Sequence, residues 1–104
     1  KMELKEEIIN DISNNRIMLY MKGTKDRPMC GFSATIVKIL NYYEVDFEAT
    51  NVLENPNIRV ELSKHSNWPT IPQLFVEGEL IGGCDIALEM HQQGQLKSVL
   101  EKDI

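Results

Sequence analysis

The chain has 104 residues, of which 42% are hydrophobic, and it carries a net charge of −5. This length suits one domain over residues 1–104 with its own core. The acidic balance argues against nucleic acid as principal partner, and no apolar run approaches the roughly 18 residues that a membrane span needs. Two cysteines are too few for a secreted disulfide scaffold, and the charged stretch 1–7 is unlike a signal peptide, so we expect a cytoplasmic protein.

The first half of the chain predicts two helices and two strands. Leu4, Ile8 and Ile12 recur at helical spacing, and Asn14-Asn15 ends that helix. Residues 17–21 are almost continuously apolar, as in a strand covered on both faces. A polar loop over 23–29 leads into an amphipathic stretch at 34–43, which predicts a second helix, and the alternating residues 45–49 predict a short strand.

The second half predicts a helix, a hairpin and two more helices. Asn55-Pro56 is typical of a helix start, with Asn as N-cap and Pro at the first helical position. Residues 74–76 and 80–81 flank the turn Glu77-Gly78 and predict a hairpin. Asp85 is predicted to cap a helix that runs to about Gln93, and a last helix follows at 96–100.

The predicted order is therefore α-β-α-β-α-β-β-α-α. Its first β-α-β unit implies two parallel strands joined by a right-handed crossover, and the hairpin adds an antiparallel strand. We expect an α/β protein of thioredoxin-like architecture, in which helices flank a mixed four-stranded sheet. Residues 18–21 should form a central strand, and residues 80–81 should lie at one edge.

The stretch Cys30-Gly31-Phe32-Ser33 is the most informative part of the chain. It stands between a predicted strand and a predicted helix, so Cys30 lies at a helix N-terminus, where a thiolate is stabilised and the thiol pKa is lowered. Ser33 cannot close a disulfide with Cys30. A buried structural cysteine is the alternative, but the turn position and nearby basic residues favour a reactive or metal-binding thiol.

Three further features are candidates for a binding site. In Trp68-Pro69-Thr70-Ile71-Pro72, a cis bond before Pro72 would present the backbone of Ile71 to an extended peptide, although a trans loop is the commoner form. Gly82-Gly83-Cys84-Asp85 opens a helix and offers either an anion site or an ordinary cap. Lys22 and Arg59 are either solvated charges or joint partners of a carboxylate.

Together these motifs resemble those of the monothiol glutaredoxins of the CGFS type. The resemblance extends over the whole chain in order and includes Met21-Lys22-Gly23, Cys30-Gly31-Phe32-Ser33, Trp68-Pro69-Thr70-Ile71-Pro72-Gln73 and Gly82-Gly83-Cys84-Asp85. It implies a thioredoxin fold with a cis bond before Pro72, a glutathione site and a 2Fe–2S cluster bridged in a homodimer. Many members carry Gln where this chain has Val60.

The resemblance also implies a role for each site residue. Cys30 is the thiol and the cluster ligand. Lys22 and Arg59 look like partners of the glycine carboxylate of glutathione, and Ile71 looks like the backbone partner of its cysteinyl unit beside Pro72. Gly83, Cys84 and Asp85 look like the cradle of its γ-glutamyl end, and Phe32 and Trp68 like walls of the site.

These features favour a carrier of 2Fe–2S clusters over a turnover enzyme. Such a cluster needs four thiolates, and two chains with two glutathione thiols supply them. By resemblance, the partners are BolA-type proteins and the scaffold and recipient apoproteins of Fe–S clusters. One alternative is a glutathione-dependent thiol-disulfide oxidoreductase that removes glutathione from mixed disulfides. Another is a redox sensor with a disulfide between Cys30 and Cys84.

Overall fold

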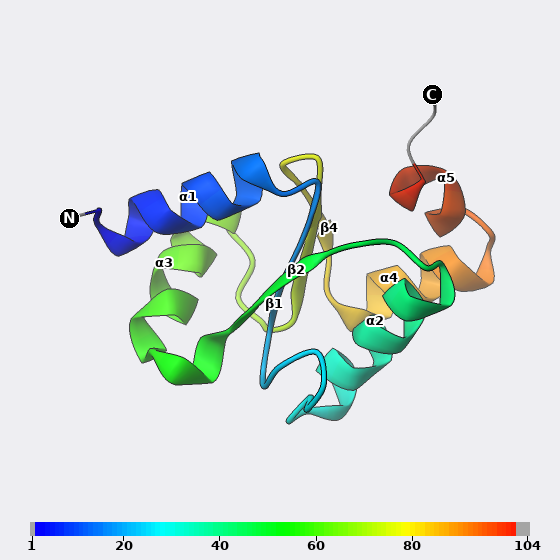
Figure 1. The fold of residues 1–104 in the computed structure, drawn as a ribbon, viewed down its shortest axis with the longest axis horizontal. Coiled ribbons are helices and arrows are strands. Elements are labelled where there is room, and N and C mark those ends of the chain that lie inside the picture. Colours follow the sequence, from blue (N-terminus) through cyan, green and yellow to red (C-terminus); the bar gives the residue numbers. More distant parts are fainter. Residues whose placement is uncertain (1, 102–104) are drawn as a thin grey trace.

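The computed structural model describes residues 2–101, and its elements follow the predicted order (Figure 1). The helices and strands are α1 (Leu4–Asn14), β1 (Ile17–Met21), α2 (Gly31–Tyr42), β2 (Glu48–Asn51), the 3-10 turn η1 (Val52–Glu54), α3 (Pro56–Ser66), β3 (Gln73–Val76), β4 (Glu79–Gly82), α4 (Cys84–Gln92) and α5 (Leu96–Leu100). Within residues 2–101, no helix has the length and apolar character needed to cross a membrane.

The four strands form one mixed sheet in the order β2-β1-β3-β4. β1 runs parallel to β2 and antiparallel to β3, and β4 pairs antiparallel with β3 at the edge. This arrangement confirms the predicted thioredoxin-like sheet with β1 at its centre. The parallel pair is joined through α2, as the crossover rule requires.

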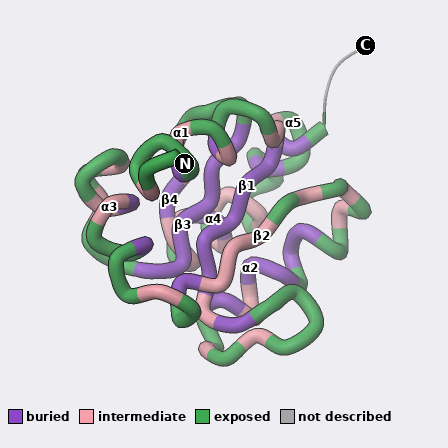
Figure 2. Tube along the Cα trace, turned by 60° about the vertical axis from the view of Figure 1, so that its left-hand side comes forward, coloured by how far each residue is buried: buried purple, intermediate pink, exposed green. Residues whose placement is uncertain are grey.

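The alternation of side chains along β1 divides the core into two layers. Ile17, Leu19 and Met21 face α2, α4 and α5, whereas Met18 and Tyr20 face α1 and α3. All five are at most 2% exposed, and the tube in Figure 2 is buried along the whole of β1. Because both faces are covered, the strand is apolar at every position, and the periodicity of the sequence there is lost.

Two elements begin three residues away from their predicted starts. The second strand begins at Glu48 and not at residue 45, since Glu44 adopts a left-handed conformation with φ of 56° and pairing with β1 starts at Met18. Val45 and Phe47 still pack against the core, from the loop before the strand. The second helix begins at Gly31, three residues earlier than predicted, with Cys30 as its N-cap.

The cap of α4 also differs from the prediction. Gly83 is the N-cap of α4, so Asp85 lies within the first turn and does not cap the helix with its side chain. His91, near the end of α4, contacts α2. It is half-buried, and its Nδ1 forms a hydrogen bond of 2.6 Å with the Tyr43 hydroxyl of α2. Sequence periodicity did not reveal this contact because the two residues lie 48 positions apart.

Candidate functional site

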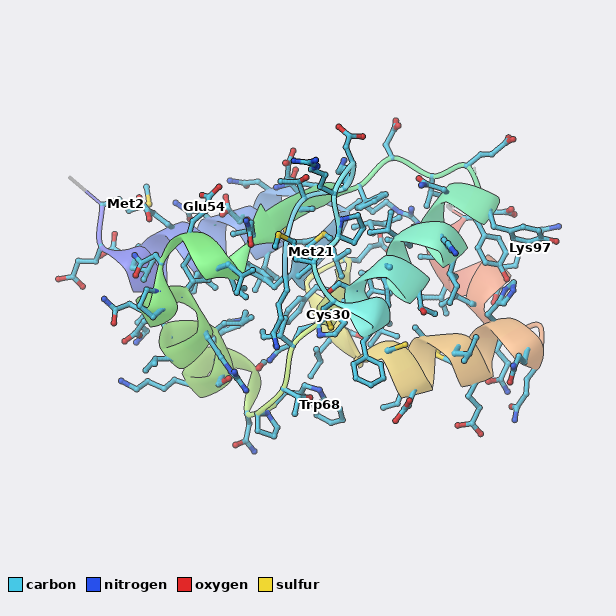
Figure 3. The ribbon with its side chains drawn as sticks, turned by 90° about the horizontal axis from the view of Figure 1, so that it is seen from below. Met2, Met21, Cys30, Glu54, Trp68 and Lys97 are labelled. Atoms are coloured by element: carbon cyan, nitrogen blue, oxygen red, sulfur yellow. The ribbon has the colours of Figure 1, made fainter. Side chains whose placement is uncertain are left out.

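One cavity of about 390 Å³ collects every residue to which the resemblance assigns a role in the site. Its lining includes Lys22, Cys30, Phe32, Arg59, Trp68, Ile71, Pro72, Gly83, Cys84 and Asp85. These residues come from the ends of β1 and β4, the starts of α2 and α4, the first turns of α3 and the loop before β3. Figure 3 shows Cys30 at the start of α2 and Trp68 on the loop below it. The volume falls within the usual range of small-ligand sites, roughly 300–1,000 Å³.

Cys30 is a partly exposed thiol that the protein holds toward its ionised form. The backbone N–H of Ser33 contributes most to lowering the pKa of Cys30, and the N–H of Phe32 and the charge of Lys22 contribute less. Partial desolvation opposes this shift. These donors are free because the first N–H groups of a helix have no partner within it. The direction of the predicted pKa shift is therefore confirmed.

Ser33 does more than replace a second cysteine. Its side chain is fully buried, and its Oγ accepts a hydrogen bond of 3.1 Å from the backbone N–H of Lys22. The same hydroxyl also makes a small contribution to lowering the pKa of Cys30. Ser33 thus fixes the turn after β1 against the start of α2 and stabilises the thiolate at the same time.

The loop before β3 forms the opposite wall of the cavity. The Ile71–Pro72 peptide bond is cis, as the resemblance implies. The buried side chain of Gln73 holds the loop, because its Nε2 donates to the carbonyl oxygens of Trp68 at 2.9 Å and Thr70 at 3.1 Å. The sequence did not predict this role of Gln73, since a polar residue at the start of a strand does not reveal which carbonyl groups it will contact.

The third wall is the start of α4. A Cβ at position 83 would lie 3.2 Å from the carbonyl oxygen of Pro72 and 3.7 Å from the indole Nε1 of Trp68, so glycine keeps this part of the cavity open. Cys84 differs from Cys30 although it also starts a helix. Desolvation, followed by the nearby charge of Asp85, raises the pKa of Cys84.

The two predicted cations lie at the same end of the cavity. Arg59 is exposed, and its guanidinium donates to the carbonyl oxygen of Pro69 at 3.3 Å, which steadies it beside the loop. Lys22 follows β1 directly. Lys25, in contrast, turns away from Cys30: its ammonium group contacts the carbonyl oxygen of Phe47 and lies 4.2 Å from the centre of that ring. The positive charge at this site comes from Lys22 and Arg59.

Two lining residues were missed by sequence analysis. Thr70 lies within the quoted loop motif and Ile86 lies in the first turn of α4, and both contribute to the cavity wall. Thr70 could have been found because it belongs to a motif that predicts part of the site. Ile86 could not, because an apolar residue at helical spacing does not by itself indicate a binding site. Neither His65 nor His91 lines the cavity.

An activated cysteine at a strand-to-helix turn, facing a cis-proline loop, defines this protein as a thiol protein of the thioredoxin fold. Comparison with known proteins narrows the class. The glutaredoxin family model matches residues 17–81. A probable monothiol glutaredoxin 2 of Rickettsia felis is 53% identical over 96 residues, covering 92% of both chains. Glutaredoxin 4 of Buchnera aphidicola is 50% identical over 101 residues, covering 97% of this chain and 94% of the relative.

A solved structure of a related protein is also similar to this chain. The solution structure of reduced poplar apo GrxS14 superposes with a TM-score of 0.81 at 45% identity, and the match covers 91% of this chain and 87% of that one. The chain belongs to the glutaredoxin family, and its single-cysteine motif places it with the monothiol glutaredoxins.

The structure predicts that the pKa of Cys30 lies below that of an ordinary thiol and that the pKa of Cys84 lies above it. A thiol-alkylating reagent should modify Cys30 much faster than Cys84 near neutral pH, because the thiolate is the reactive form. Ser33→Ala should raise the pKa of Cys30, since one donor is lost while the backbone N–H remains. The measurement is the alkylation rate of each cysteine against pH, followed by mass spectrometry.

Thr35→Val is the matched control for that titration. Thr35 is also in the first turns of α2, but its hydroxyl acts on Cys84 and on the carbonyl oxygen of Gly31. The variant should leave the pKa of Cys30 where it is. An unchanged Cys30 profile in Ser33→Ala would contradict the role assigned to the hydroxyl.

Proposed function

We propose that this protein binds glutathione and carries a 2Fe–2S cluster between two copies of the chain, which it then delivers to other proteins. The observation that carries the proposal is a single activated thiol at a ligand-sized cavity, with Ser33 in place of a second cysteine. Within residues 2–101, no three side chains of His, Cys, Asp or Glu are grouped to hold a metal ion. A cluster therefore needs ligands from outside one chain.

Glutathione fits the distribution of charge in the cavity. Lys22 and Arg59 would receive its glycine carboxylate, and the backbone of Ile71 beside Pro72 would pair with its cysteinyl unit. The first N–H groups of α4 would receive the carboxylate of the γ-glutamyl end, whose amine would meet Asp85. This orientation brings the glutathione thiol toward Cys30.

Gly83 and Cys84 would surround the γ-glutamyl end of glutathione, and Phe32 and Trp68 would form walls of the binding site. One observation favours a polar ligand here. The indole Nε1–H of Trp68 is buried and has no hydrogen-bond partner among the described residues. A buried donor without a partner costs about 1–3 kcal/mol, so a ligand carbonyl at this wall would be stabilised.

The surface around Cys30 suits a second copy of the chain. Met29 and Phe32 flank the cysteine and are 68% and 60% exposed, respectively. Large apolar side chains in such a position favour a contact that removes them from water. Two chains would then supply two Cys30 thiolates, and two glutathione molecules would supply the other two that a 2Fe–2S cluster needs.

This set of ligands favours transfer of the cluster over its storage. Half of the ligands would be small molecules that dissociate freely, so the cluster can pass to another set of thiolates by ligand exchange. We propose that the protein acts in the reducing cytoplasm and that its partners are scaffold and recipient apoproteins of Fe–S clusters and BolA-type proteins. A reducing compartment also keeps Cys30 available as a thiolate.

Removing either cation should weaken the binding of glutathione. Lys22→Ala or Arg59→Ala should each weaken binding by about 1.5–3 kcal/mol, the range for a hydrogen bond to a charged group. Asp85→Ala should also weaken the binding of glutathione, because it removes the partner of the amine. Lys64→Ala, on the outer surface of α3, is the matched control and should leave the Kd unchanged. If titration calorimetry gives equal Kd values for all four variants, the assigned orientation is wrong.

Replacing each cysteine separates the proposed ligand from its neighbour. Cys30→Ser should abolish the visible absorption of the cluster and the dimer that it holds together. Cys84→Ser should keep both, because Cys84 borders the cavity with a raised pKa and serves mainly through its backbone. Each variant is reconstituted with iron, sulfide and glutathione and is analysed by size exclusion with absorbance detection. A colourless, monomeric Cys84→Ser variant would make Cys84 a ligand.

The protein should be a slow oxidoreductase. With glutathione as reductant, it should reduce a small mixed disulfide much more slowly than its own Ser33→Cys variant, in which the buried residue beside Cys30 becomes a resolving thiol. The readout is the initial rate of the two proteins at equal concentration. A wild-type rate equal to or above that of the variant would favour the alternative function, removal of glutathione from mixed disulfides.

A further inference from the structure

A second cavity adjoins the first at its cationic end. It has a volume of about 220 Å³ and is lined by Lys22, Val52, Leu53, Pro56 and Arg59. Lys22 and Arg59 line both cavities, so the two meet at the pair of positive charges. The other three lining residues are apolar. A volume below that of typical small-ligand sites suits one side chain and not a whole ligand.

The second cavity is built on fixed backbone. The Oδ1 of Asn51 accepts hydrogen bonds from the backbone N–H of Gly23 at 2.9 Å and of Leu53 at 3.0 Å. These bonds tie the turn after β1, which carries Lys22, to η1, which carries Leu53. The labelled Glu54 marks η1 in Figure 3. The position of Leu53 relative to Lys22 therefore does not depend on a bound ligand.

Leu53 is left exposed by this arrangement. Val52, its neighbour in η1, is only 5% exposed and forms the floor of the cavity, whereas Leu53 is 53% exposed and forms its wall. The hydrogen bond from the N–H of Leu53 to Asn51 fixes the backbone of η1 in a conformation that leaves Leu53 exposed. An apolar wall that the fold keeps in water gains free energy when another apolar group covers it.

We propose that this second cavity is a subsite for an apolar side chain on the residue that bears the terminal carboxylate of the ligand. The inference rests on the proposed function, in which Lys22 and Arg59 hold that carboxylate. A side chain on the same residue leaves from the atom next to the carboxylate, at the boundary of the two cavities. Glycine, the last residue of glutathione, has no side chain and leaves the subsite empty.

The charges define the class of ligand. The lining of the second cavity has no acidic residue, and the lining of the main cavity has only Asp85, to which the proposed orientation assigns the amine end of the ligand. The subsite therefore selects a free carboxylate with an apolar side chain and disfavours an amidated or cationic end. Thiol peptides that end in Cys-Leu or Cys-Val have this chemistry, whether they are small γ-glutamyl peptides or the ends of protein chains.

The test compares pairs of reduced peptides by anaerobic titration calorimetry. In the wild-type protein, γ-Glu-Cys-Leu should bind at least about fivefold more tightly than glutathione, the change expected when part of a leucine side chain leaves water. The amide of γ-Glu-Cys-Leu should lose this advantage. N-acetylated Ala-Cys-Leu, compared with N-acetylated Ala-Cys-Gly, tests whether the preference extends to the end of a protein chain.

Variants locate the preference in the subsite. Leu53→Ser should reduce the ratio of the two Kd values to less than about twofold, because the apolar wall is lost. Val60→Ser is the matched control: Val60 is 51% exposed on α3 but lines neither cavity, so the ratio should stay as in the wild type. Since each ratio is measured within one variant, a general loss of stability does not affect it.

The outcomes separate this inference from the proposed function. If glutathione binds and γ-Glu-Cys-Leu binds no more tightly, the subsite is wrong and the glutathione site stands. If γ-Glu-Cys-Leu binds more tightly than glutathione also in Leu53→Ser, the leucine side chain of the peptide lies elsewhere and the proposed subsite is wrong. If none of the peptides binds, both proposals fail. A leucine preference that is lost in Leu53→Ser and kept in Val60→Ser supports the subsite.

Discussion

The site depends on the backbone N–H groups that the start of α2 presents to Cys30 and that lower the pKa of its thiol. The N–H of Ser33 contributes most to stabilising the thiolate. The hydroxyl of the same residue adds to this stabilisation, and its oxygen accepts a hydrogen bond from the backbone N–H of Lys22. Because this buried side chain lies beside the sulfur and binds the backbone of Lys22, it sets where the chain at Lys22 lies relative to Cys30. A cysteine at this turn without those donors would be an ordinary thiol.

Two helix starts share the cavity but give their cysteines opposite properties. α2 begins after Cys30, whose sulfur stays partly exposed and meets free N–H groups, whereas α4 begins at Cys84, where desolvation and Asp85 oppose ionisation. A helix N-terminus therefore does not by itself activate a thiol. The access of solvent and the sign of the nearest charge decide which cysteine is available to a ligand-exchange reaction.

Much of the fold could be predicted from the sequence because the strong signals are local. The apolar run of β1, the Asn55-Pro56 start of α3 and the turn at Glu77-Gly78 each specify their own element. The limits of β2 could not be predicted, since an edge strand is defined by its partner in β1 and Val45 and Phe47 are apolar for packing alone. Boundaries set by pairing need the tertiary structure.

The site residues could be collected from their motifs, but what holds them in place could not. Gln73 supports the loop through two carbonyl groups, and Asn51 accepts a hydrogen bond from the backbone N–H of Gly23, which lies 28 residues earlier in the chain. Polar residues in such positions look the same in the sequence as solvated ones. The subsite beside Leu53 depends on that bridge and is therefore a property of the fold, not of any motif.

The visible absorption spectrum of the anaerobically purified protein, recorded before and after glutathione is removed and with iron and glutathione counted per chain, tests the central claim most directly. The account predicts cluster absorption with one iron and one glutathione per chain, lost when glutathione is removed and restored when glutathione, iron and sulfide are returned. Absorption that persists without glutathione, or a protein that stays colourless after reconstitution, would contradict it.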